Sequence, residues 1–173
     1  MTSYPTASWA DRRLDVRASA LGGVGGFATA PIGEGETLLI LGGPLLTQPE
    51  MERTLAAYIA AGKYFNSLQV EEGLHLHLED VLPVPFNHSC DSNGWMADAV
   101  TVVARRDITP GEEVTVDYTL QTAQPVALLE CSCRCGATAC RGTITGDDWR
   151  LPDVQERYRG HFAPFINERI AGA

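Results

Sequence analysis

The sequence predicts a mainly β fold with short helices. Short apolar segments recur between residues 37 and 118, are bounded by glycine, proline or acidic turns, and have the length of strands. Apolar residues with helical spacing occur in only a few short stretches, and no alternation of strands and helices typical of βαβ units is present. With 173 residues, 45% of them hydrophobic, the chain can form the core of one compact domain.

The predicted strands follow one another with short turns between them. A turn with two glycines at residues 33–36 leads into the first strand, and another turn at 71–73 separates two later ones. His75 and His77 alternate with leucines, so both are expected on one face, hydrogen-bonded or solvated rather than bound to a metal. The strands are expected at residues 37–41, 64–70, 74–78, 100–104 and 113–118.

Three helices are predicted from capping and breaking residues. Thr47 and Glu50 have the spacing of a capping box, and Gly62 is suited to end the helix that this box begins. Near the C-terminus, Gly160 and Pro164 are expected to divide an apolar stripe into two short helices. The apolar residues predicted to share a helical face are Leu55, Tyr58 and Ile59 in the first helix, and Leu151, Val154 and Tyr158 near the C-terminus.

The chain is strongly acidic, with a formal net charge of −9 and a sequence pI of about 4.8. A surface of this sign repels nucleic-acid phosphates, so a basic protein or peptide is expected as partner rather than a nucleic acid. The same charge can also serve solubility alone. Residues 1–20 lack the apolar stretch of a signal peptide, and no apolar run is long enough to span a membrane. A soluble, cytoplasmic protein without a membrane partner is therefore expected.

A cluster of cysteines indicates a metal site. Cys133, Cys135 and Cys140 lie within eight residues, and structural zinc takes four such ligands. Cys131 and Cys90 both qualify as the fourth ligand on spacing alone. The total of five cysteines is odd, which argues against a disulfide framework, although reduced cysteines without metal are an alternative.

Two arginines flank this cluster. Four thiolates around Zn²⁺ would carry a net charge of −2, and Arg134 and Arg141 are close enough in sequence to offset it. We therefore expect these side chains to face the metal site.

Four motifs occur in a fixed order along the chain. They are Gly23-Val24-Gly25 with Phe27-Ala28; Asn87-His88-Ser89-Cys90-Asp91-Ser92-Asn93; a segment from Ala104 that ends in Gly111-Glu112-Glu113-Val114-Thr115-Val116-Asp117-Tyr118; and Cys133-Arg134-Cys135 followed by Cys140-Arg141-Gly142. In this order they resemble the SET-domain family of protein lysine methyltransferases, including its post-SET zinc module. Ser92 stands where the family usually has proline.

The resemblance implies a SET-domain-like β-rich fold in which the segments around Asn87 and Tyr118 form a knot-like core. It also implies that Cys90 is the fourth ligand of a structural Zn²⁺, with Cys133, Cys135 and Cys140, which leaves Cys131 free. The expected division of the chain is residues 1–20 as an N-terminal arm, 21–130 as the SET-like catalytic domain, 131–146 as the post-SET zinc module and 147–173 as a C-terminal helical segment.

The resemblance further implies an S-adenosylmethionine-dependent N-methyltransferase that acts on a lysine of a basic protein or peptide. Tyr118 matches the catalytic tyrosine of the family, whereas Asp117 and Glu113 are expected to hold local structure rather than act as bases. The residues expected to bind the methyl donor are Gly23, Val24, Gly25, Asn87, His88 and Tyr118. Those expected to line the substrate channel are Tyr64, Asn66 and Val116.

The expected channel departs from the family pattern. Val116 and Asn66 stand where many members have an aromatic residue, and no aromatic residue follows Cys140 directly. Trp149 is expected to be packed in the interior rather than to cover the channel. Two alternatives follow: an inactive SET-like binding module stabilised by zinc, or an N-methyltransferase that acts on a small amine metabolite.

Overall fold

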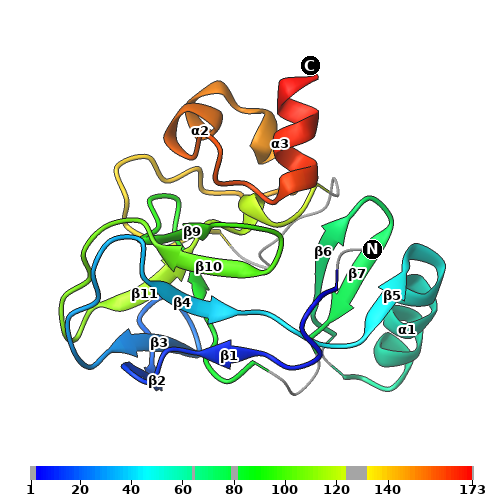
Figure 1. Cartoon of the computed structure of the whole chain (residues 1–173), viewed down its shortest axis with the longest axis horizontal. Helices are drawn as coiled ribbons and strands as arrows, with labels where there is room; N and C mark the ends of the chain where they lie inside the picture. The colour runs from blue at the N-terminus through cyan, green and yellow to red at the C-terminus, as the bar shows by residue number, and fades with distance from the viewer. Residues whose placement is uncertain (1–2, 64, 79–81, 124–131, 173) are drawn as a thin grey trace.

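The structure, a computed structural model, describes residues 3–63, 65–78, 82–123 and 132–172. Two β-sheets and short helices make up this part of the chain, which confirms the predicted mainly β fold (Figure 1). The strands are β1 (Trp9–Ala10), β2 (Leu14–Ala18), β3 (Val24–Ala28), β4 (Thr37–Ile40), β5 (Leu45–Thr47), β6 (Ser67–Glu71), β7 (Leu74–His77), β8 (Asn87–His88), β9 (Gly94–Met96), β10 (Thr101–Ala104) and β11 (Glu113–Val116). The helices are α1 (Gln48–Ala60), α2 (Pro152–Arg157) and α3 (Pro164–Ala171), with 3-10 turns η1 (Tyr118–Leu120) and η2 (Asp148–Arg150).

The larger sheet has the strand order β1-β4-β10-β9-β11-β3-β2, and β8 pairs with β11 beside this path. Most neighbours are antiparallel, but β11 runs parallel to both β8 and β9. The register of the first of these pairs places Thr115 opposite Asn87 and Val116 opposite His88. The two segments that the resemblance assigns to the core of the fold are therefore hydrogen-bonded neighbours, although they are far apart in sequence.

Two short strands near the N-terminus, β1 and β2, belong to this sheet. β1 pairs with β4, and β2 forms a hairpin with β3 in which Arg17 lies opposite Gly25. Only Leu14 of β2 is buried, and its other side chains are exposed. Because a single inward side chain produces no apolar alternation, the sequence pattern does not reveal this strand.

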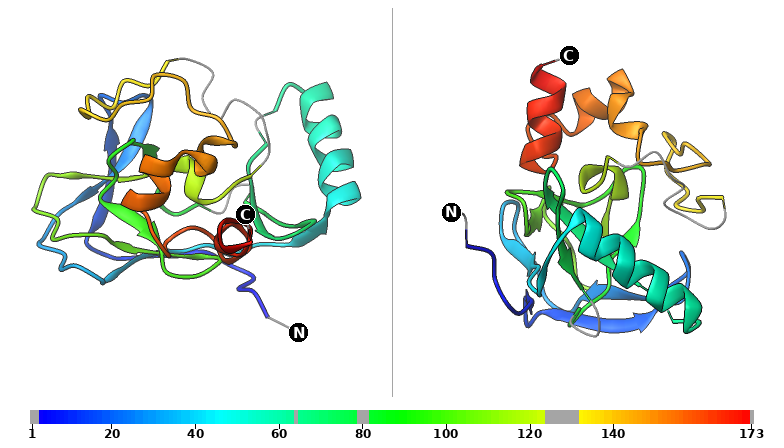
Figure 2. Two further views of the ribbon diagram at one scale, coloured as in Figure 1. Left: turned by 90° about the horizontal axis from the view of Figure 1, so that it is seen from above. Right: turned by 90° about the vertical axis from the view of Figure 1, so that its right-hand side faces the viewer.

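The smaller sheet has the order β5-β7-β6, and α1 packs beside β5 and β7 at one end of the molecule (Figures 1 and 2). The predicted capping box is present, because the backbone N–H of Thr47 donates to a Glu50 carboxylate oxygen over 2.8 Å. Gly62 follows the helix with a φ of +64°, as expected of a terminating glycine. The predicted apolar face is wrong at Ile59, which is 68% exposed, because α1 contacts a narrow sheet and buries only Met51.

The two histidines of β7 make hydrogen-bonding and ring contacts. His75 is buried, and its Nε2 lies 2.7 Å from the side-chain oxygen of Gln48. The ring of His77 stacks on Phe65 with 5.0 Å between centroids. Neither residue belongs to a group of potential metal ligands within the described chain. The contact of His75 with Gln48 agrees with the expectation of a hydrogen-bonded histidine.

The C-terminal segment packs on the larger sheet through buried aromatic side chains, and α2 and α3 lie above β9 and β10 in Figure 1. Tyr158 is fully buried, and its hydroxyl donates to the backbone carbonyl of Cys90 over 3.1 Å. Trp149 is buried, as predicted. None of the described helices is both long and apolar enough to cross a bilayer. The remaining core includes Leu38, Met96, Val102, Val114, Leu120, Phe162 and Ile166.

Candidate active site and cysteine cluster

Four cysteines from two distant segments meet beside the C-terminal end of β8. Their sulfur atoms all lie within 4.8 Å of one another. Cys90 is buried and follows β8, and its sulfur lies 4.0 Å from that of Cys133. These are the four residues to which the resemblance points, whereas Cys131 lies outside the described residues. The group at this position is Cys90, Cys133, Cys135 and Cys140.

The chemistry and spacing of the cluster fit a structural zinc ion. Tetrahedral Zn²⁺ with Zn–S bonds of roughly 2.3 Å needs sulfur atoms about 3.8 Å apart, close to the spacing of the four thiols. Burial raises the pKa of Cys133 to about 11 and also raises the pKa of Cys90. Although burial opposes it, hydrogen bonding from backbone N–H groups lowers the pKa of Cys135 to about 7. A bound metal cation would stabilise all four cysteines as thiolates and offset the repulsion between their negative charges.

The ring of His88 connects this cluster to the segment of Tyr118. His88 Nε2 lies 3.3 Å from the sulfur of Cys90, and its Nδ1 accepts the backbone N–H of Tyr118 over 3.2 Å. Since Nδ1 accepts, the proton of the neutral ring is on Nε2 and faces the sulfur. Burial lowers the pKa of His88, which favours this neutral form. The side chain is thus engaged inside the protein, and its backbone pairs with Val116 of β11.

Arg141 makes a second connection between the cysteine cluster and the segment of Tyr118. Its backbone N–H donates to the sulfur of Cys90 over 3.4 Å, while its guanidinium donates two 2.8 Å hydrogen bonds to Asp117. A third hydrogen bond, of 2.7 Å, goes to Asp148. Hydrogen bonding to Asp117 raises the pKa of Arg141 despite its burial. Although burial raises the pKa of the Cys90 thiol, the positive charge of Arg141 acts to lower it, as expected of a residue that offsets the charge of the cluster. Arg134 is exposed, and its role at the cluster stays a prediction.

The glycine-rich motif forms the turn and first residues of the β2–β3 hairpin. Gly23 has a φ of +54°, a conformation that favours glycine, and its carbonyl accepts the backbone N–H of Ser19 over 3.1 Å. Val24 begins β3 and is half exposed. Gly25 is buried beside Glu113 and Asn87, and a Cβ there would collide with the Glu113 carboxylate. The second glycine of the motif is therefore required by close approach rather than by backbone conformation.

Asn87 is held in place by this hairpin and by β11. Its side-chain amide donates to the carbonyl of Val24 over 3.0 Å and to Glu113 Oε1 over 2.7 Å. The Glu113 carboxylate also accepts the hydroxyl of Ser19 at 2.8 Å. The chain Ser19–Glu113–Asn87 fixes the amide group next to Gly25. Glu113 holds local structure, as predicted, but the structure adds that it positions a predicted donor-site residue.

A cavity of about 510 Å³ is lined in part by Tyr118. Asn66, Val116 and Tyr118, three of the predicted channel and catalytic residues, line it together. Tyr64, the other predicted channel residue, is not among the described residues. The remaining walls are mostly apolar side chains from several elements, including α1, β4, β6, β10 and the segment before β8. They are Leu39, Leu41, Leu55, Leu68, Leu78, Leu82, Val84, Phe86 and Val102, with Phe65, Ser67, Gln121 and Thr122 completing the lining.

Tyr118 lies where the cavity meets the predicted donor side. Its hydroxyl donates to the backbone carbonyl of Phe86, the residue before Asn87, over 3.1 Å. Phe86 in turn lines the cavity and lies against Gly26 of β3. Tyr118 is the first residue of η1, and the carboxylate of Asp117 caps this turn by accepting the N–H of Thr119 over 3.3 Å.

Sequence reasoning missed Ser19 and most of the cavity walls. Ser19 lies 94 residues from its partner Glu113, and nothing in its neighbourhood distinguishes it from an ordinary turn serine. Leu39, Leu41 and Val102 appear in the sequence only as strand residues. The alternation of β4 and β10 could have indicated a shared face, but not that part of this face is left open as a cavity.

The known proteins that the chain matches identify its family. The family model of the SET domain matches residues 23–119, more than half of the chain. The chain belongs to the SET domain family. The matched region contains the glycine motif, Asn87, His88, Cys90 and Tyr118, and the cysteine cluster is consistent with a post-SET zinc module.

Curated relatives of this SET domain are histone-lysine N-methyltransferases. Histone-lysine N-methyltransferase ash1 of Drosophila melanogaster is 29% identical over 75% of this chain and 6% of its own length. The H3 lysine-36 specific histone-lysine N-methyltransferase of Yarrowia lipolytica is 31% identical over 77% of the chain and 18% of its own length. TRX1 of Oryza sativa subsp. japonica, another histone-lysine N-methyltransferase, is 26% identical over 77% of the chain and 14% of its own length. The chain thus spans less than a fifth of each of these relatives.

Proposed function

We propose that this SET domain transfers a methyl group from S-adenosylmethionine to the ε-amine of a lysine in a basic protein or peptide. The observation that carries the proposal is that Tyr118 lines a cavity with many apolar walls while its hydroxyl binds the backbone of Phe86, the residue before Asn87. An acceptor amine in the cavity and a methyl donor held by Asn87 would both lie near this tyrosine. The family of the chain and the names of its curated relatives support the same reaction.

The residues beside Gly25 are suited to a methyl donor. S-adenosylmethionine would supply a methyl group bonded to a positively charged sulfur. A neutral amine can attack the methyl carbon, and the sulfur then leaves as a neutral thioether. The backbone of Gly23, Val24 and Gly25 and the side chain of Asn87 would hold it, with the backbone of His88 and the ring of Tyr118 nearby. The missing Cβ at Gly25 leaves room for the Glu113 and Asn87 side chains to meet there, which fixes the Asn87 amide beside the glycine motif.

The cavity is suited to the acceptor. A lysine amine has a pKa of about 10.4 in water and must lose its proton before it can accept a methyl group. Apolar walls such as Val116, Leu39 and Leu41 penalise the charged amine and so favour its neutral form. The Tyr118 hydroxyl would then orient the amine, and alignment of this kind can lower a barrier by several kcal/mol.

The cysteine cluster would support this chemistry indirectly. We propose that Cys90, Cys133, Cys135 and Cys140 bind a structural Zn²⁺ and that residues 131–146 form a post-SET module. The ion would fix Cys90, and with it the adjoining Asn87 and His88, in the geometry that the donor needs. The proposed units are residues 21–130 for catalysis, 131–146 for zinc and 147–173 for the C-terminal helices.

Transfer of a labelled methyl group to histones tests the proposal, because the curated relatives are named for histone lysine. We expect labelling of native histones and none of histones whose lysines are chemically acetylated, since acetylation removes the acceptor amine. The Asp153→Asn variant, at an exposed position outside both hollows, should label equally well. Donor binding in calorimetry without any transfer to proteins would favour a different acceptor, such as a small amine. Absence of donor binding with zinc present would favour a non-catalytic binding module.

A further inference from the structure

A second hollow, of about 710 Å³, lies away from the proposed active site. The N-terminal segment, the end of β6, the turn after β9 and the start of α3 surround it. Its floor consists of apolar side chains from three of these elements: Val70, Ala99, Val100 and Phe165. None of its lining residues lines the cavity at Tyr118. The two hollows are therefore separate, and the second one has no role in the proposed reaction.

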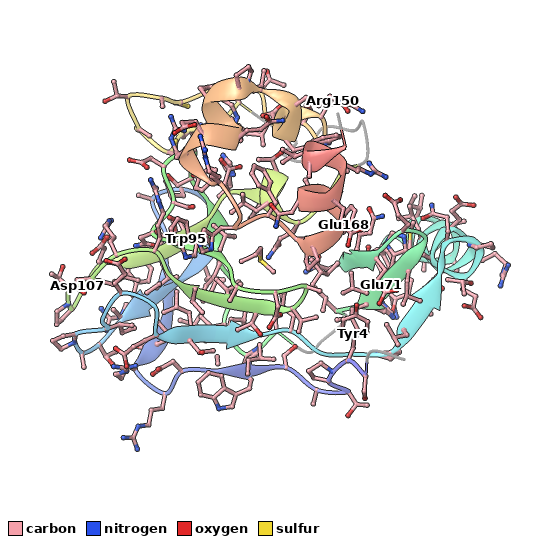
Figure 3. All side chains as sticks on the ribbon, turned by 45° about the horizontal axis from the view of Figure 1, so that its top comes forward. Tyr4, Glu71, Trp95, Asp107, Arg150 and Glu168 are labelled. Atoms are coloured by element: carbon pink, nitrogen blue, oxygen red, sulfur yellow. The ribbon has the colours of Figure 1, made fainter. Side chains whose placement is uncertain are left out.

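Carboxylates surround this floor, so we name the hollow the acidic groove. Glu71, Glu72, Asp98 and Glu168 line it, and among the described residues no lysine, arginine or histidine belongs to the lining. Figure 3 shows the side chains of Tyr4, Glu71 and Glu168 gathered on this side of the molecule, from the N-terminal segment, β6 and α3. Three separate parts of the chain thus contribute to a common negative rim.

The charge of the rim is only partly compensated within the described structure. Glu72 forms an ion pair with Arg169, whose guanidinium also lies 5.7 Å from the centroid of the Phe165 ring, so this cation compensates one carboxylate of the rim. Glu71 accepts the neutral hydroxyl of Tyr4 over 2.7 Å, and Asp98 accepts backbone N–H groups of Val100 and Thr101. These hydrogen bonds leave both carboxylates negative. Burial and the neighbouring Glu71 raise the pKa of Tyr4 to about 12, which is consistent with a negative potential at the groove.

The distribution of the carboxylates argues against a metal ion. A cation such as Ca²⁺ needs several oxygen ligands around one point. Within the described chain, the four cysteines are the group of potential ligands close enough for an ion, and no carboxylate of the acidic groove belongs to such a group. The charges are therefore spread along the rim. Spread negative charge over an apolar floor is complementary to an extended chain with separated cationic side chains.

We propose that the acidic groove docks a basic segment of a partner protein. Cationic side chains of that segment meet Glu71 and Glu168, and an apolar side chain between them packs on Phe165 and Val70. The net charge of −9 adds a long-range attraction for such a partner. This docking does not depend on methyl transfer, because the groove and the proposed active site share no lining residue.

Binding of a labelled peptide tests this proposal on the full, zinc-loaded chain. The probe is a fluorescent eight-residue peptide of alternating arginine and leucine with blocked ends, which contains no lysine to be methylated. Fluorescence anisotropy at about 50 mM salt gives the dissociation constant. We expect the double variant Glu71→Gln/Glu168→Gln to bind at least tenfold more weakly, and binding to weaken as salt rises.

A matched double variant controls for net charge. Glu34→Gln/Asp153→Asn removes the same two charges from exposed positions outside the groove and is expected to bind within about twofold of the unmodified chain. Tyr118→Phe should also bind unchanged, which separates docking from the proposed catalysis. Melting temperatures of all variants should agree within a few degrees, which shows that the fold is intact.

Three results would overturn the proposal. Equal weakening by both double variants would mean that the peptide senses only overall charge. Equal binding of a peptide with glutamine in place of arginine would remove the role of the carboxylates. Sedimentation of the unmodified chain as a dimer that Glu71→Gln/Glu168→Gln dissociates would mean that a second copy, rather than a basic partner, occupies the groove.

Discussion

Arg141 donates two hydrogen bonds of 2.8 Å to the carboxylate of Asp117, the residue before Tyr118. The same arginine lies directly after Cys140 and donates its backbone N–H to the sulfur of Cys90. A single residue therefore connects the cysteine cluster to the turn that carries the proposed catalytic tyrosine. Asp117 is fully buried, so Arg141 is paired with a carboxylate that solvent does not reach.

Replacement of Arg141 by alanine is expected to destabilise the fold and to reduce methyl transfer. Loss of one member of a buried ion pair leaves an uncompensated charge and costs about 3 kcal/mol. Denaturant unfolding of the purified variant measures this cost. The exposed pair of Arg159 and Glu156 provides the control, since Arg159→Ala should change the free energy of unfolding by less than about 0.5 kcal/mol. Equal effects of the two substitutions would contradict the structural role of Arg141.

Removal of zinc is expected to weaken donor binding as well as stability. Cys90 lies three residues after Asn87, and His88 contacts its sulfur, so loss of the metal releases the segment that holds the donor. Metal analysis should give one zinc per chain, and treatment with a chelator should lower both the melting temperature and the donor affinity in calorimetry. Cys135→Ser should have the same effect. Cys131→Ser, which removes a cysteine outside the proposed ligand set, should retain zinc and donor binding.

Glu113→Ala is expected to weaken binding of the methyl donor by about tenfold or more. The substitution removes the acceptor of the Asn87 amide, and hydrogen bonds to charged groups contribute roughly 1.5–3 kcal/mol. Ser19→Ala should have a smaller effect in the same direction, because it removes one donor to Glu113 but leaves the carboxylate in place. Calorimetric titration of the donor distinguishes the two. Unchanged affinity in Glu113→Ala would show that the position of Asn87 does not matter for the donor.

Protonation of His75 is expected to make stability depend on pH. Burial lowers the pKa of His75 from its ordinary value of 6.5, so the folded state favours the neutral ring. Its contribution is fully present above pH 6.5 and is lost as pH falls through 6.5 toward the folded pKa, because the unfolded chain takes up the proton first. Thermal unfolding at pH 7.5 and 5.5 should therefore show a smaller difference for His75→Gln than for the unmodified chain. Identical differences would contradict this role.

Much of the fold could be predicted from local patterns. The Thr47–Glu50 capping box, the strand of Val102 and the four clustered cysteines all depend on residue types at short spacings or on motifs. The periodicity or ligand chemistry of these features can be recognised without knowledge of the tertiary structure.

Features that depend on long-range partners could not be predicted in this way. Arg141 was expected to offset the charge of the metal site, but its hydrogen bonds to the fully buried Asp117, 24 residues away in sequence, have no signal in the local pattern. Ile59 has helical spacing but no element to cover it. The strand around Leu14 shows one buried side chain, so only its pairing with β3 identifies it.

Single-turnover methyl transfer by Tyr118→Phe tests the central claim most directly. The substitution keeps the ring and removes only the hydroxyl that donates to the Phe86 carbonyl beside the cavity. With saturating donor and a lysine-containing histone, we predict a rate lower by about 100-fold, with donor affinity within a few fold of the unmodified chain. An unchanged rate in a folded, zinc-loaded variant would contradict the assignment of Tyr118 and the active site built around it.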